Sequence, residues 1–112
     1  MSRLPAPAHA TVLFELTART RAGNVKRVFS GYRPLYAITT DTWTSTSHEF
    51  LDVPHVETGD RARAQVWFPV PENYPGSLWV GRTLKVAEGA RDVGGATVLA
   101  VHHPLLARDG LA

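Results

Sequence analysis

Basic and aromatic side chains alternate with small apolar ones over residues 61–70. On an extended strand, alternate side chains point to opposite faces. The residues expected to point inward are Ala62, Ala64, Val66 and Phe68. The residues expected to point outward are Arg61, Arg63, Gln65 and Trp67. Arginine and tryptophan are enriched at binding hot spots, and basic residues interleaved with an aromatic also suit stacking on nucleic-acid bases. A plain exposed strand, with Trp67 covered by the proline-rich corner after it, is the alternative.

Arg33 and Arg91 are two further arginines that we consider for this face. Arg33 follows Gly31, whose backbone has a freedom that other residues lack, and precedes Pro34. Proline fixes its own φ and pushes the preceding residue toward extended geometry. The stiff corner would therefore hold the planar donors of the Arg33 guanidinium in a defined direction. A surface arginine lying over apolar neighbours is the alternative.

Histidines are the only side chains here that raise the question of a metal site, since the chain has no cysteine. Those considered are His48, His55, His102 and His103. Adjacent histidines on a strand point to opposite faces, so one ion is not expected to bind both His102 and His103. No His-x-x-x-His or His–carboxylate spacing typical of zinc occurs. The sequence predicts no metal and no cofactor.

Catalytic residues in a recognisable pattern are also missing from the sequence. The carboxylates considered are spread through turns without a patterned partner: Asp41, Glu49, Asp52, Glu57 and Asp60. Ser45 and Ser47 lie near His48, but no nucleophile-elbow glycines accompany them. We therefore expect a protein that is not an enzyme.

Size and composition favour one globular domain. The chain has 112 residues, too few for two independent cores, and 44% of them are hydrophobic, too many for a disordered protein. A net charge of +2 is too mild to dictate a nucleic-acid partner. No apolar run approaches the roughly 20 residues that cross a membrane. Residues 1–9 do not resemble a secretory signal, and we expect a cytoplasmic protein.

The elements that would position these side chains are short strands, because nine glycines and eight prolines imply many turns. Strands are expected at residues 11–20, 25–29, 31–40, 49–51, 61–70, 83–87 and 93–101, with residues 78–80 extending a strand at a corner. The turn at residues 21–24 would return 25–29 along the first strand. Residues 52–59 are expected to be a connection, and Gly94-Gly95 a bulge or a close backbone approach.

Six or seven strands without a covering helix must bury their apolar side by folding the sheet on itself. The sequence therefore predicts an all-β fold, a small antiparallel barrel over residues 10–101. We expect a flexible lead-in at residues 1–9 and a C-terminal tail at residues 102–112.

The order of motifs resembles that of the C-terminal β-barrel domain (domain 3) of translation elongation factor Tu. That family reads F-x-G-Y-R-P-Q-F and then R-T-T-D. Here residues 29–34 read F-S-G-Y-R-P and residues 39–41 read T-T-D. A Gly-Asp turn at residues 59–60 precedes an alternating strand, and residues 89–99 stand where the family has G-G-R-T-V-G-x-G and a run of valines. The resemblance covers about residues 10–101 and implies a six-stranded antiparallel Greek-key barrel.

The departures from that family limit what the resemblance implies. No G-x-x-x-x-G-K-[ST] loop is present, so GTP binding does not follow from it. In elongation factor Tu, the third domain contributes to binding the T-stem of aminoacyl-tRNA and to the exchange-factor interface. Arg33 matches a basic position there, whereas Ile38 replaces the arginine that precedes Thr-Thr-Asp in the family. One phosphate contact is thereby lost, which weakens the tRNA hypothesis.

We therefore expect a stand-alone, non-enzymatic binding module whose first hypothesis is a protein partner linked to translation. Direct binding of tRNA or structured RNA is the second hypothesis. Self-association through an exposed strand edge and Trp67 is the third, and the oligomeric state is left open. The candidate binding residues are Arg33, Arg61, Arg63, Gln65, Trp67 and Arg91.

Overall fold

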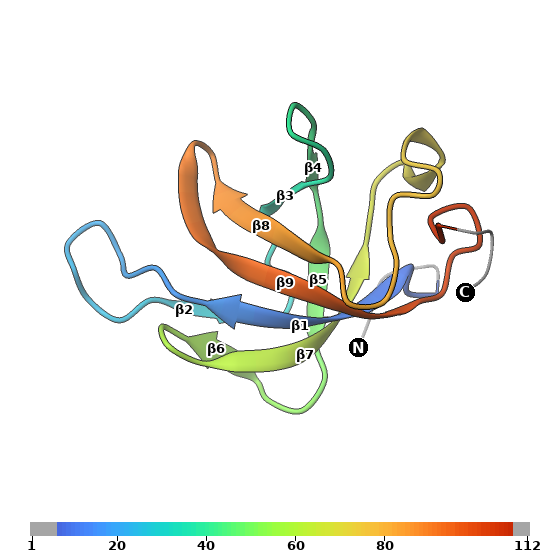
Figure 1. Ribbon diagram of the computed structural model, residues 1–112. Helices are drawn as coiled ribbons and strands as arrows, with labels where there is room; N and C mark the ends of the chain where they lie inside the picture. The colour runs from blue at the N-terminus through green and yellow to red at the C-terminus, as the bar shows by residue number, and fades with distance from the viewer. Residues whose placement is uncertain (1–6, 109–112) are drawn as a thin grey trace.

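The computed structural model describes residues 7–108 and confirms the all-β fold. The strands are β1 (Ala10–Leu16), β2 (Arg27–Phe29), β3 (Leu35–Ala37), β4 (Trp43–Ser45), β5 (Ser47–Phe50), β6 (His55–Glu57), β7 (Arg61–Trp67), β8 (Thr83–Glu88) and β9 (Arg91–Val101) (Figure 1). Within residues 7–108, the one helical element is a 3-10 turn, η1 (Pro71–Asn73). No helix in this part of the chain is long and apolar enough to cross a membrane.

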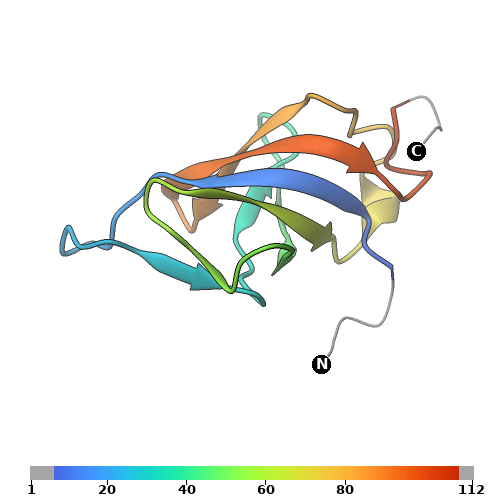
Figure 2. The same ribbon diagram turned by 90° about the horizontal axis from the view of Figure 1, so that it is seen from below.

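Seven strands form one antiparallel sheet in the order β4-β3-β8-β9-β1-β7-β5. Its two edge strands, β4 and β5, are consecutive in the chain and are separated by Thr46 alone. The amides of Thr46 and His48 donate to the carbonyl oxygens of Pro34 and Tyr32, at 2.9 and 3.0 Å. Segment 43–50 is therefore bonded to the β3 side of the sheet as well as to β7. The sheet curls until its two edges meet in this segment (Figures 1 and 2).

Counted as one bent strand, segment 43–50 makes the barrel six-stranded. β3, this segment and β7 are consecutive in the chain and adjacent in the sheet. β1 precedes β3 in the chain, separated from it by the long connection 17–34, and lies next to β7. Three consecutive neighbours with a further strand brought beside them by a long connection are a Greek key. The expected six-stranded antiparallel Greek-key barrel is confirmed.

The sequence predicts that residues 25–29 pair with the first strand, and this prediction is wrong. The turn forms, because the Thr20 amide donates to the Asn24 carbonyl at 2.9 Å and Gly23 has a φ of 90°. However, β7 and β9 already occupy both edges of β1, so β2 pairs with β6 in a separate two-stranded arm. β6 itself lies in residues 52–59, where the sequence predicts only a connection.

Other expected strands change in extent. The strand expected at residues 31–40 shortens to β3, and the one at residues 49–51 begins earlier, as β5. Residues 78–80 supply only Leu78, in an isolated bridge with Ala107. The close approach expected near Gly94 is confirmed, because a Cβ there would lie 1.9 Å from the carbonyl oxygen of Glu15.

The barrel interior holds a buried pair of hydrogen-bonded rings. The Tyr36 hydroxyl lies 2.7 Å from Nε2 of His48, while Nδ1 faces the carbonyl oxygens of Thr46 and Tyr32 at 3.1 and 3.3 Å. Because a carbonyl oxygen only accepts, Nδ1 carries the hydrogen and Nε2 accepts from Tyr36. Complete burial lowers the pKa of His48 to about 4, since the two carbonyls offset only part of the desolvation. His48 is therefore neutral in the folded protein near pH 7.

The described parts of the expected lead-in and tail pack against the barrel. The Phe68 amide donates to Nδ1 of His9 at 2.9 Å, and the two rings stack. Leu106 and Ala107 are buried in the core. Residues 102–108 are thus part of the fold, whereas residues 1–6 and 109–112 lie outside the described residues.

Candidate functional site

The outward side of β7 carries the predicted alternation of side chains. Arg61 and Arg63 are exposed, Gln65 and Trp67 are partly buried, and the alanines between them face the core. We call Arg61, Arg63, Gln65 and Trp67 together the β7 face. Strand geometry alone places these four side chains on one surface.

Acidic side chains lie beside the basic members of the β7 face. Arg63 donates from Nε and Nη2 to the Asp52 carboxylate in a bidentate pair, at 2.9 to 3.0 Å. Arg61 lies opposite Glu15 of β1 in the strand register. On its other edge, β7 places Gln65 opposite Glu49. The positive charge of the face is therefore balanced by its neighbours.

Arg33 lies near the Trp67 end of the β7 face. The register of β3 with β4 continues along segment 43–50, which sets Arg33 opposite Ser47. Ser47 in turn pairs with Trp67. The backbones of Arg33 and Trp67 are thus two strand spacings apart, about 10 Å. Within residues 7–108, no acidic side chain pairs with the exposed Arg33.

Arg91 does not join this group. It begins β9, and its guanidinium donates to the carbonyl of Arg19, beyond the end of β1. Arg61 lies opposite Glu15, several residues further back along β1. The four residues of the β7 face share one surface, and Arg33 lies near its Trp67 end. Arg91 lies beyond the Arg61 end of this face.

The histidines considered for a metal are dispersed over the fold. His48 is buried, His55 lies 3.2 Å from a Glu57 oxygen, and His102 bonds to the Thr11 hydroxyl at 2.8 Å. His103 packs edge-on against the ring of His9. In the described part of the chain, no three or more His, Cys, Asp or Glu side chains are grouped so that they could hold a metal ion.

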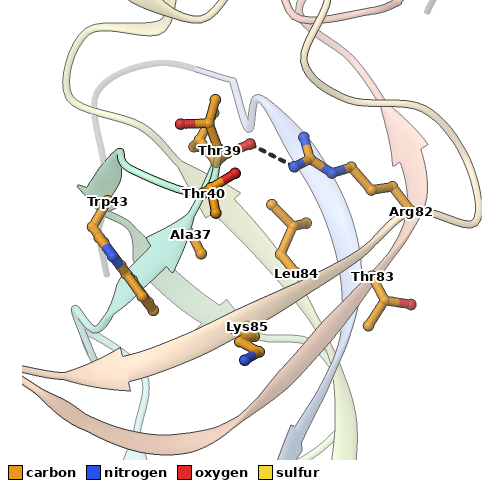
Figure 3. Close-up of a pocket in the computed structure, with 9 residues that line it drawn as sticks. Ala37, Thr39, Thr40, Trp43, Arg82, Thr83, Leu84 and Lys85 are labelled. Atoms are coloured by element: carbon orange, nitrogen blue, oxygen red, sulfur yellow. Dashed lines mark hydrogen bonds between the residues drawn. The ribbon is translucent and has the colours of Figure 1, made fainter.

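A second region, absent from the sequence-based prediction, lies where two strands separate. β3 pairs with β8 only at Leu35↔Ala87 and Tyr36↔Val86. Beyond these pairs the strands diverge, and a cleft of about 540 Å³ opens on the outside of the barrel (Figure 3). We call it the β3–β8 cleft; its lining residues are Ala37, Ile38, Thr39, Thr40, Trp43, Arg82, Thr83, Leu84 and Lys85.

The Arg82 side chain connects two backbone segments at the rim of the β3–β8 cleft. Its guanidinium donates to the carbonyl oxygens of Ile38 and Ser77, which ties the end of β3 to the corner before β8. The same group lies 5.0 Å from the centre of the Trp79 ring. Partial burial lowers the pKa of Arg82 from its usual value. Figure 3 shows Arg82 across the cleft from Trp43, with Leu84 between them.

Trp43 and Lys85 supply the accessible aromatic and basic groups of the cleft. Trp43 is 40% exposed, and Lys85 points outward from β8. No described residue that lines the cleft is acidic, and within residues 7–108 no acidic side chain pairs with Lys85. One signal in the sequence pointed here: Trp43 is a lone aromatic in the Thr- and Ser-rich run 39–47.

Comparison with models of known protein families finds no match, and no curated protein matches the sequence. What the domain does is therefore inferred from the β7 face, the β3–β8 cleft and the order of motifs along the chain.

Proposed function

We propose that this domain is a binding module without catalytic chemistry, and that it binds a protein partner through the β7 face together with Arg33. The observation that carries this proposal is that the face is rich in arginine and tryptophan yet balanced in charge. Arg63 is already held in a bidentate pair by Asp52, and Arg61 lies opposite Glu15. Protein interfaces favour aromatic and arginine anchors, whereas affinity for a phosphate backbone depends on cations available to phosphate.

The translation apparatus is the setting that we propose for the partner. Support comes from the order of the motifs F-S-G-Y-R-P, T-T-D and Gly-Asp, which resembles domain 3 of elongation factor Tu. The six-stranded Greek-key barrel is the fold which that resemblance implies. Gly31 within the first motif has a φ of 99°, a conformation that favours glycine.

Affinity capture from a lysate of the source organism, with and without nuclease, tests the proposal. We expect a nuclease-resistant protein to be captured by the full chain and lost with the double variant R63A/W67A. The matched control is R21A, which removes an exposed arginine in the 21–24 turn, away from this face. Circular dichroism verifies that each variant is folded. Capture that survives R63A/W67A would remove the β7 face from the proposal.

Direct binding of tRNA or structured RNA is the second candidate, and Arg33 favours it. Arg33 is the exposed cation beside Trp67 that has no acidic partner in the described chain. If RNA binds there, affinity falls steeply between low and moderate salt, and R33A weakens binding without changing the fold. A titration that detects no RNA binding at low salt would dispose of this candidate.

Self-association is the third candidate, and the β2–β6 arm favours it. Phe29 on this arm is 57% exposed, and two-stranded pairs leave edges that another strand can join. Sedimentation at high protein concentration tests this candidate. A single monomeric species would exclude it.

A further inference from the structure

The first half of β8 is an open strand edge. Residues 83–85 pair with β9, where Thr83 lies opposite Thr97 and Lys85 opposite Gly95. Within residues 7–108, no strand pairs with their other side, because the ladder to β3 ends at Tyr36. In an antiparallel ladder, successive residues direct their N–H and C=O groups to alternate sides. Alternate backbone groups of residues 83–85 therefore face the β3–β8 cleft.

The end of β3 is bonded to a side chain and not to the backbone of β8. Continued pairing would set Ala37 opposite Lys85 and Thr39 opposite Thr83, but the ladder stops at Tyr36. The carbonyl of the next residue but one, Ile38, accepts from the Arg82 guanidinium, and its amide donates to Thr42 across the β3–β4 turn at 2.9 Å. Within residues 7–108, the backbone edge of residues 83–85 is therefore left without a strand on this side.

The charge of the cleft is one-sided. Arg82 and Lys85 are its two ionisable lining residues, and the hydroxyls of Thr39, Thr40 and Thr83 are the other polar side chains. Asp41 in the adjacent turn is outside the lining, and its amide donates to the Thr39 hydroxyl. Glu88, at the far end of β8, is engaged by Lys26 and Tyr32. The cleft therefore complements an acidic ligand.

We infer that the β3–β8 cleft receives an extended acidic segment of a protein, which adds a strand to β8 and sets a carboxylate beside Lys85. An open backbone edge is complemented by another backbone, which a free anion lacks. The cleft volume of about 540 Å³ falls in the range of ligand sites. Trp43 lies on the side of the cleft opposite Arg82. One side chain of the added segment packs against the Trp43 ring. This inference rests on the proposed function and names the chemistry of the partner.

The experiment is an NMR titration of the full chain with a capped peptide, Thr-Glu-Thr-Glu-Thr. We expect shifts at the amides of residues 83–85 and at the Trp43 indole. Replacing both glutamates of the peptide by lysine abolishes these shifts. K85E weakens binding of the acidic peptide at least tenfold, whereas R21A leaves it unchanged. K85Q, which is milder, gives a smaller loss and serves if K85E does not fold.

Backbone N-methylation separates strand addition from simple charge attraction. One peptide is methylated at its glutamate amides and a second at its threonine amides, and the two carry the same charge. Because only alternate amides face β8, one methylated peptide loses binding and the other keeps it. Equal binding of the two peptides would overturn the inference, as would undiminished binding to K85E and K85Q.

Failure of the peptide is distinguishable from failure of the proposed function. If the full chain captures a nuclease-resistant protein but no peptide shifts appear at residues 83–85, the strand-addition inference is wrong and the binding function stands. If poly(U) shifts these residues and displaces the peptide at equal concentration, the cleft is a nucleic-acid site and the inference is overturned.

Discussion

The β7 face and the β3–β8 cleft both place a tryptophan near basic side chains, yet they are opposite in construction. On β7 the ladder continues on both sides, to β1 and β5, and Arg63 is held by Asp52. At the cleft the ladder ends, and Lys85 has no acidic neighbour in the lining. Similar residue types thus form a balanced surface in one region and an uncompensated site in the other.

Strand pairing accounts for this difference. β1 brings Glu15 opposite Arg61, and the connection after β5 brings Asp52 to Arg63. Where β3 leaves β8, no strand of residues 7–108 lies on the cleft side of Lys85 to bring an acid to it. Neighbouring strands and connections thus bring acids to Arg61 and Arg63, whereas the interruption of the ladder leaves Lys85 without one.

The largest effect on stability is expected from a substitution that disrupts the barrel, and with it both the β7 face and the β3–β8 cleft. In G94A the new Cβ would lie 1.9 Å from the carbonyl oxygen of Glu15, so β1 and β9 are forced apart. We expect a loss of about 3 kcal/mol in the free energy of unfolding. G95A is the matched control, because its Cβ meets only the Leu84 carbonyl, at 3.6 Å. Coincident urea denaturation curves for the two variants would contradict the expected clash.

Low pH is expected to destabilise the barrel through segment 43–50, which supplies Trp43 to the β3–β8 cleft and pairs with β7. His48 lies in segment 43–50, and its pKa is lowered from 6.5 to about 4 by burial. The unfolded chain therefore takes up the proton first, so stability is complete above pH 6.5 and falls as the pH drops toward 4. The loss is about 3 kcal/mol. Urea denaturation from pH 7 to 4 measures it, and H48Q should flatten the dependence; an equally steep H48Q profile would assign it elsewhere.

R82Q tests the cleft alone. It removes two charge-assisted bonds, to the carbonyls of Ile38 and Ser77, and we expect a loss of about 2 kcal/mol in stability. Amide exchange at residues 38–42 should also accelerate. R108A is the control, since the Arg108 guanidinium lies over the same Trp79 ring at 4.8 Å while no carbonyl bond of that guanidinium is seen in the described chain. Equal losses of stability in both variants would show that stacking on Trp79, and not the bonds from Arg82 to the two carbonyls, stabilises the fold.

The smallest effect on stability is expected at the β7 face. D52N removes the partner of Arg63, but the pair is largely exposed, so stability changes by less than about 0.5 kcal/mol. The face becomes more basic, and its affinity for poly(U) at low salt should rise while the acidic peptide still binds the cleft as before. A D52N variant that gains no affinity for poly(U) would exclude Arg63 from any phosphate contact.

Long strands were predictable from the sequence, whereas short strands were predictable only in part. β1, β7 and β9 have enough residues for period-2 alternation to stand out, and Gly94 marks the close approach between β1 and β9. The sequence predicts a strand at β2 but the wrong neighbour for it, and it predicts only a connection at β6; three residues are too few for a pattern. Their partners are distant in the chain, so local propensity cannot choose between β1 and β6 as the neighbour of β2.

The candidate site was predictable only where one strand determines it. The β7 face follows from alternation within residues 61–67, and Arg33 from the stiff corner before β3. The acidic residues beside the arginines come from β1 and from the connection after β5, so the pattern of residues 61–67 does not indicate them. The β3–β8 cleft arises where the ladder between β3 and β8 ends at Tyr36, and the sequence pattern around Lys85 does not indicate this end.

The shared strand at residues 43–50 also bears on how the barrel opens. An ordinary sheet frays from its edges, but here the two edges are one segment, bonded to the β3 side through Thr46 and His48 and to β7 through β5. Detaching it from one neighbour opens the ring and also strains its ladder to the other. Local fraying thereby becomes coupled to global unfolding. Hydrogen exchange in this Thr- and Ser-rich segment should accordingly be as slow as in the apolar centre of β1.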